Sequence, residues 1–304
     1  MMRKIFLLAF LSVFLSYSLF GEEILGRIKN ENLLIPRKIL LSRENIFILD
    51  MGNESIKIFT AEGTFLKKFG RKGQGPGEFV NAVDFCLSNG KIYVLDPEVS
   101  KLEIFSEKGE RLDSKRINIS NSFSIAVNGG NIYISTVSFL KGQKIIHILD
   151  NKFSPKKSFL DCFPLEGMNL DSIYKNFGCL AVSDDRVYFA FTLTNKLLEF
   201  SSSGELLKEY LLPLKSIEKP EIERKNAQML LKKGLNYDIK AKGEKVYLLS
   251  RDEKGNSIIF ELEKGNLKER FKLKEKLMSF DITQERIYGM EEEEGNVIIY
   301  RIKK

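Results

Sequence analysis

The sequence predicts an all-β fold, a six-bladed β-propeller of four-stranded blades. Two observations carry this prediction, the recurrence of one strand unit along the chain and the length of that unit. An apolar strand, a turn, a second apolar strand and a Gly-containing turn recur along the chain, most clearly in 45–63 and 91–109. Such a unit cannot bury its apolar faces alone, so its copies must pack on one another. Four strands in about 40–50 residues are typical of a propeller blade.

The N-terminal segment has the pattern of a secretory signal. Arg3 and Lys4 precede the apolar run 5–15, and a cleavage site follows at Gly21. We therefore expect a signal peptide in 1–21 and a single propeller domain in 22–304. The apolar run is short for a transmembrane span, so we expect an exported, periplasmic or extracellular protein without a stable membrane span after cleavage. An uncleaved anchor stays as the alternative.

The charge of the mature chain does not suggest a nucleic-acid partner. Removing Arg3 and Lys4 lowers the formal net charge from +7 to +5, and lysine and glutamate are interspersed along the chain. Nucleic-acid binding requires basic residues gathered on one face. We expect no nucleic acid among the partners.

Six repeats align on the start of their second strand. Each start follows a short turn, and a mainly apolar strand such as 82–87 precedes that turn. Polarity then rises across the unit, because inner strands lie between neighbouring blades and the outermost strand meets water. The six starts are Ile46, Ile92, Ile132, Val187, Val246 and Ile287.

The last repeat lacks a fourth strand. It ends after the apolar run 296–302, while the segment 23–28 near the mature N-terminus has no partner within its own repeat. We expect the N-terminal strand to close the last blade from outside.

The long connections are predicted on one face of the propeller. They are 70–79, 135–144, 162–178 and 213–234, whereas the connections of the opposite face are short. Elaborated loops on one face of a rigid scaffold are the usual layout of a binding surface.

The insertion 213–234, between blades 4 and 5, is predicted to be helical. Pro220 and Glu221 suit the first turn of a helix, Lys233 suits the last turn, and Gly234 suits the cap. This helix would either cover the central channel in part or pack on the rim.

Three motifs resemble the NHL repeat and a related bacterial family of secreted six-bladed propellers. They are Gly70-Arg-Lys-Gly-Gln-Gly-Pro-Gly-Glu-Phe79, Ile92-Tyr-Val-Leu-Asp96 and Ile104-Phe-Ser-Glu-Lys-Gly109. The likeness weakens in blades 3 and 4, where 132–136 and 187–190 lack the aspartate. The resemblance implies the propeller architecture and mostly binding roles, with a few enzymes.

The enzymes among these propellers use characteristic catalytic or metal-binding side chains, and this sequence can be searched for them. Amidating lyases of this fold bind zinc through several histidines, and a Ser-His-Asp triad also needs one, but the chain has only His147. This histidine lies in the apolar run 144–149, where we expect a structural role.

Lactonase-like propellers instead hold calcium through oxygen ligands in the channel. Asp84, Asp238 and Asp281 lie on the inner strands of blades 2, 5 and 6, but the inner strands of blades 1, 3 and 4 carry no matching acid. We expect these aspartates to bond to backbone or water, with calcium chelation as the alternative.

The cysteines do not form a disulfide framework. Cys86, Cys162 and Cys179 are few and scattered. We expect buried free thiols, with a bridge between Cys162 and Cys179 as the alternative.

The main functional hypothesis is an exported, non-enzymatic propeller that binds a protein, peptide or glycan and needs no cofactor. Its expected binding residues are Arg71, Lys72, Gln74 and Glu78, near the channel mouth. The alternatives are a calcium-dependent lactonase-like hydrolase and an envelope scaffold without a small ligand.

Overall fold

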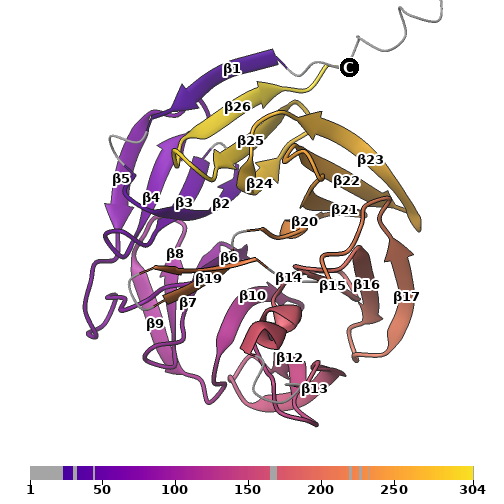
Figure 1. Ribbon diagram of the computed structural model, residues 1–304. Coiled ribbons are helices and arrows are strands. Elements are labelled where there is room, and N and C mark those ends of the chain that lie inside the picture. The colour runs from indigo at the N-terminus through magenta and orange to yellow at the C-terminus, as the bar shows by residue number, and fades with distance from the viewer. Residues whose placement is uncertain are drawn as a thin grey trace, which may run out of the picture.

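Six four-stranded antiparallel sheets surround a central axis in the computed structural model (Figure 1). The structure describes residues 23–29, 33–43, 45–164, 170–218, 221–225, 228–231 and 233–303. Each sheet is one blade, and in blades 1 to 5 the strands follow sequence order from the axis to the rim. This arrangement confirms the predicted six-bladed propeller. The expected signal peptide lies outside the described residues.

Blades 1 to 3 each consist of four strands that are consecutive in the sequence. Blade 1 contains β2 (Pro36–Ser42), β3 (Asn45–Asp50), β4 (Ser55–Thr60) and β5 (Phe65–Phe69). Blade 2 contains β6 (Asp84–Ser88), β7 (Lys91–Asp96), β8 (Lys101–Ser106) and β9 (Arg111–Arg116). Blade 3 contains β10 (Ser122–Asn128), β11 (Asn131–Thr136), β12 (Lys144–Leu149) and β13 (Pro155–Asp161).

Blades 4 and 5 repeat the pattern. Blade 4 contains β14 (Gly178–Ser183), β15 (Arg186–Phe191), β16 (Lys196–Ser201) and β17 (Leu206–Leu211). Blade 5 contains β20 (Asn236–Lys242), β21 (Lys245–Arg251), β22 (Ser257–Glu263) and β23 (Asn266–Leu273). The predicted starts of the second strands all lie in the second strand of their blade.

Blade 6 joins the two ends of the chain. Its inner strands are β24 (Leu277–Ile282), β25 (Arg286–Glu291) and β26 (Val297–Arg301), and β1 (Glu23–Ile28) pairs with β26 on the outside. The pairing is antiparallel and runs from Glu23 opposite Arg301 to Ile28 opposite Val297. The predicted closure by the N-terminal strand is confirmed.

The hydrophobic core consists of six clusters, one at each junction between neighbouring blades. At the junction of blades 1 and 2, Phe47 and Phe85 are fully buried. The inner strands are apolar on both faces because each blade is covered by a neighbour on either side. Blade packing, and not any single sheet, therefore removes the apolar surface from water.

The aspartate of the repeat motif has a structural task. The carboxylate of Asp50 accepts hydrogen bonds from the backbone N–H groups of Leu34 and Ile35 at 2.9 and 2.8 Å. Asp96 accepts from Val80 and Asn81 in the same way. An aspartate at the end of a second strand thus holds the chain just before it enters the inner strand of its own blade.

The helix expected in 213–234 is wrong. The described part of this insertion contains an antiparallel hairpin of β18 (Ile222–Lys225) and β19 (Gln228–Leu231), in which Ile222 lies opposite Leu231. The end signals that favoured a helix are weak by themselves, and a short isolated helix is only marginally stable in water.

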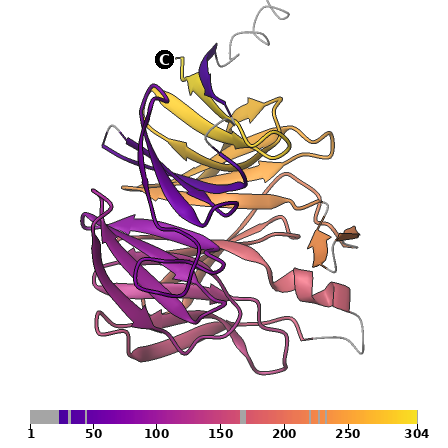
Figure 2. The same ribbon diagram turned by 90° about the vertical axis from the view of Figure 1, so that its left-hand side faces the viewer.

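A short 3₁₀ helix, η2 (Leu170–Asn176), lies instead before blade 4. The hairpin and η2 project from the same face of the ring (Figure 2). Among the described residues, no helix has the length and apolar character needed to cross a membrane.

The elaborated face is the face on which the inner strands begin. The long connections between blades and the longest turn between a second and a third strand, 137–143, open on this face, and the turns on the opposite face are short. In the connection 70–79, Gly70 and Gly77 adopt φ angles of 79° and 77°, which side chains rarely tolerate.

Candidate functional site

The central channel opens on the elaborated face as a cavity of about 380 Å³. All six blades contribute to its lining, together with η2. Its volume lies within the range of about 300–1,000 Å³ that is usual for small-molecule sites. A site built from six separate repeats is positioned by the whole ring.

Three carboxylates of the cavity lining each have a cationic partner. Lys38 Nζ lies 2.5 Å from Asp84 Oδ1, and Lys240 Nζ lies 2.7 Å from Asp238 Oδ2. Arg251 contacts Glu292 at 2.7 Å. The two buried aspartates and the exposed Glu292 are thus each neutralised by a cation of the protein itself.

Asp238 illustrates the balance between burial and pairing. Burial alone raises the pKa of its carboxyl, but the charges of Lys240 and Lys38 and a hydrogen bond from Ser279 outweigh that effect. The pKa of Asp238 therefore lies below its usual value, and the carboxylate is ionised at neutral pH.

Arg37 is the cation of the cavity without such a partner. This half-buried residue of β2 lines the cavity, and its guanidinium forms no hydrogen bond or ion pair with any described residue. Its guanidinium carbon lies 5.5 Å from the centre of the Phe123 ring. Burial lowers the pKa of Arg37, and the charge of Asp84 opposes this shift only in part. The guanidinium still carries its charge at neutral pH, and it has five N–H donors.

Aromatic rings form the wall beside Arg37. The rings of Phe123 and Phe177 meet edge to face at 4.9 Å, and Tyr174 stacks on Phe177 at 5.4 Å. In blade 5, the Tyr237 ring lies under the Arg251 guanidinium at 4.0 Å, and the Tyr237 hydroxyl accepts a hydrogen bond from Arg251. The cavity therefore combines one unpaired positive charge with apolar and aromatic surface.

The three aspartates singled out in the sequence bond to the backbone of the next blade. Asp84 accepts from the Ile125 N–H, Asp238 from the Phe280 N–H and Asp281 from the Leu41 N–H. Asp84 and Asp238 line the cavity, whereas Asp281 does not. The structure therefore does not bring the three carboxylates together around one point.

These residues do not fit a calcium site. Calcium takes about six to eight oxygen ligands, but the ammonium groups of Lys38 and Lys240 already lie against Asp84 and Asp238. Within the described part of the chain, no group of three or more His, Cys, Asp or Glu residues is placed to hold a metal ion.

The expected binding residues of 70–79 lie apart from the cavity lining. Arg71, Lys72 and Gln74 are exposed, and Arg71 forms an ion pair with Glu78 at 2.8 Å. Glu78 also accepts a hydrogen bond from the Gly75 N–H. This segment packs on the outer strands of blade 2, and its binding role stays a prediction.

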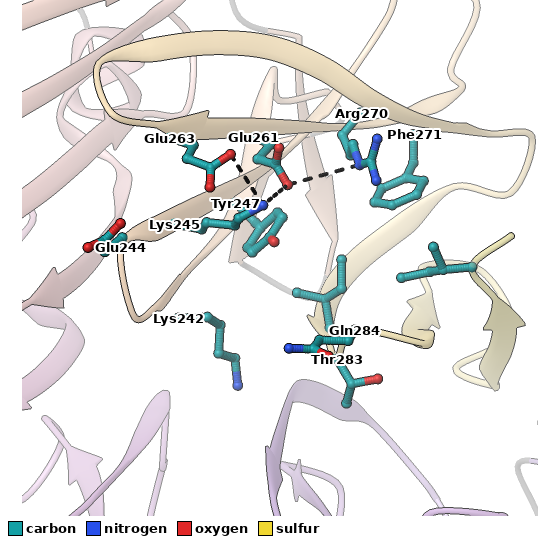
Figure 3. Close-up of a pocket in the computed structure, with 12 residues that line it drawn as sticks. Lys242, Glu244, Lys245, Tyr247, Glu261, Glu263, Arg270, Phe271, Thr283 and Gln284 are labelled. Atoms are coloured by element: carbon teal, nitrogen blue, oxygen red, sulfur yellow. Dashed lines mark hydrogen bonds and ion pairs between the residues drawn. The ribbon is translucent and has the colours of Figure 1, made fainter. Parts of the chain in front are cut away.

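A second groove of about 560 Å³ lies between blades 5 and 6, where the face with the short turns meets the rim (Figure 3). Four of its charged side chains pair with one another. Glu261 lies 3.3 Å from Lys245 and 4.0 Å from Arg270, and Lys245 also contacts Glu263 (Figure 3). We therefore regard the central cavity as the better candidate site.

The three cysteines and His147 have the surroundings of structural residues. All three cysteines are free, and burial raises the pKa of Cys86 and Cys179 well above the usual range, so neither is a thiolate at neutral pH. Burial lowers the pKa of His147. Its two ring nitrogens lie within hydrogen-bond distance of Ser158 Oγ and the Lys144 carbonyl oxygen.

Sequence reasoning missed Arg37, Lys38 and the aromatic wall. The available signal was the pair of basic residues at the start of an inner strand that is otherwise apolar. The same signal did identify the three aspartates, because a charge in an inner strand must be paired or must face the channel.

Comparisons with known proteins agree on the fold. The family model described as "Domain of unknown function (DUF4934)" matches residues 29–285. A search of curated protein sequences found no match.

The solved structures that are similar in fold over nearly the whole chain include the following three. A member of the DUF4221 family from Bacteroides vulgatus has a TM-score of 0.62 and 10% identity, and the match covers 93% of this chain and 98% of that one. A protein of Bacteroides fragilis that is described as exported has a TM-score of 0.59 and 14% identity, with coverage of 94% and 95%. Virginiamycin B lyase from Staphylococcus aureus has a TM-score of 0.56 and 14% identity, with coverage of 94% and 100%. At these identities the likeness concerns the fold alone.

Proposed function

We propose a function from the central cavity, because the chain belongs to the DUF4934 family and the function of that family is unknown. The proposed function is that of an exported, non-catalytic propeller that binds a protein, peptide or glycan on its elaborated face. The part of the ligand that is recognised enters the central cavity. The observation that carries this proposal is the convergence of all six blades on one open cavity on the face with the long loops.

The chemistry of the cavity favours binding over catalysis. Asp84 and Asp238 are committed to lysine ammonium groups and to backbone N–H groups. A general base needs a free lone pair near the reacting proton. Export is supported by the signal-like segment 1–21 and by the exported protein among the structural neighbours.

A binding screen tests the proposal. Small metabolites, peptides and oligosaccharides would be screened by thermal shift against the wild type and against Met278→Trp, which places an indole in the cavity lined by Met278. Leu206→Trp, at an exposed position on the rim, is the matched control. We expect compounds that stabilise the wild type and the control but not Met278→Trp.

Two results would contradict this function. Compounds that stabilise Met278→Trp as much as the wild type would show that the cavity is not their binding site. An absence of stabilising compounds, together with stable cross-linked protein complexes, would favour the envelope scaffold instead.

Metal analysis tests the hydrolase alternative. We expect no stoichiometric calcium in the purified protein, because the channel carboxylates are paired with lysines. Bound calcium that is lost in Asp238→Ala would support the enzyme in place of the binding protein.

A further inference from the structure

The charged side chains around the central cavity leave one positive charge without a partner. Asp84, Asp238 and Glu292 are paired with Lys38, Lys240 and Arg251 respectively. Arg37 is the fourth cation, and no carboxylate of the described chain pairs with it. Removing a charged group from water is costly unless the group is paired, so the cavity favours one further negative charge.

The surroundings of Arg37 limit the form of that anion. The guanidinium offers parallel donors that match the two oxygens of a carboxylate. A doubly charged phosphate would bring one negative charge more than the single unpaired cation neutralises. The Phe123, Phe177 and Tyr174 rings beside Arg37 offer apolar surface to whatever is attached to the acid group.

We propose that the central cavity binds a carboxylate attached to an apolar or aromatic body, with the Arg37 guanidinium holding the carboxylate and the Phe123 wall contacting the body. This inference rests on the proposed function and names the chemistry of the ligand group that enters the cavity. The same chemistry occurs in a free organic acid and at the C-terminus of a peptide that ends in an apolar residue.

Matched acids and amides test the inference. The probes are 3-phenylpropionate with 3-phenylpropionamide, and N-acetylphenylalanine with its primary amide, measured by titration calorimetry against the wild-type chain. Inorganic phosphate is a fifth probe. We expect each acid to bind at least about tenfold more tightly than its amide, because a hydrogen bond to a charged group is lost in the amide. Phosphate should bind more weakly than either acid.

Variants locate the recognition. Arg37→Gln should abolish the preference for the acid, and Arg37→Lys should keep part of it, because the charge remains while the paired donors are lost. Arg116→Gln removes an exposed arginine on the outer strand of blade 2 and should keep the full preference. Tighter binding of N-acetylphenylalanine indicates a peptide C-terminus, and tighter binding of 3-phenylpropionate indicates a free acid. Both results support the inference.

Three outcomes would overturn the inference. They are equal affinity for acids and amides, an acid preference that survives in Arg37→Gln, and the absence of binding by both acids. Tight binding of phosphate would contradict the role of the apolar body. None of these results alone removes the proposed binding function, which is decided by the loss of screening hits in Met278→Trp.

Discussion

Asp84 on the inner strand of blade 2 accepts a hydrogen bond of 2.8 Å from the backbone N–H of Ile125 on the inner strand of blade 3. The same bond recurs from Phe280 to Asp238 and from Leu41 to Asp281. The three aspartates therefore link three of the six blade junctions: 2 to 3, 5 to 6, and 6 to 1. They stabilise the ring at the edge where the inner strands border the channel.

Loss of such a link should destabilise the protein. Asp84→Ala would leave the Ile125 N–H and the Ser124 hydroxyl without their acceptor and Lys38 without its ion pair. We expect the free energy of unfolding to fall by about 3 kcal/mol or more in urea titrations. The control is Asp161→Ala, whose carboxylate forms an exposed pair with Lys144. That change should cost less than about 1 kcal/mol, and an equal effect of both variants would refute the link.

The ion pair of Asp238 should make stability depend on pH. Because the folded protein holds the pKa of Asp238 below its usual value, the folded carboxyl binds a proton less readily than the unfolded one. Its stabilising effect is complete above the unfolded pKa of about 3.9 and is lost as the pH falls through the lower folded pKa. Urea unfolding at pH 7 and pH 3 should show Asp238→Asn less stable than the wild type at pH 7, with a smaller difference at pH 3. A difference that stays constant between the two pH values would contradict this reasoning.

The closing strand should be essential for thermal stability. Ile28 of β1 is buried in the core cluster between blades 6 and 1, and Arg27 forms an ion pair with Glu291. Removing residues 22–30 should lower Tm by more than about 5 °C, since about 1 kcal/mol corresponds to roughly 2–4 °C in a large domain. The control is the chain that starts at residue 22, which keeps β1 and should melt at the higher temperature. An unchanged melt after removal of 22–30 would contradict the closure.

Arg37, which lines the cavity, and Arg251, which bonds to the lining residues Tyr237 and Glu292, should respond differently to substitution. Arg251 donates to Tyr237, to Glu292 and to the Leu277 carbonyl, so Arg251→Gln should lower Tm. Arg37 has no such bonds, and its burial without an anion is unfavourable. Arg37→Gln should therefore leave Tm unchanged or raise it in the absence of ligand. A large loss of stability in Arg37→Gln would show that Arg37 is a structural residue.

The fold was predictable because each blade is a local pattern. Second strands such as 92–95 alternate with turns that need glycine or a polar residue, and the segment 23–28 matched the missing strand of the last blade. The helix prediction in 213–234 failed because it rested on end signals, such as Lys233 and Gly234, without a packing partner to stabilise a helix.

The site was less predictable, because its residues come from different repeats. Arg37 and Phe123 are far apart in the sequence, and only closure of the ring brings them to one cavity. The long connection 70–79 drew attention for its glycines, yet it packs on the outer strands of blade 2. The length of the connections between strands identified the face that carries the cavity, but it did not identify the residues that line the cavity.

A crystal structure of the protein with a bound compound from the screen tests the central claim most directly. We expect ligand in the central cavity, with an acid group within hydrogen-bond distance of Arg37 and an apolar part against Phe123. Ligand bound instead on 70–79, or in the groove lined by Lys245 and Glu261, with the cavity free of ligand, would contradict it.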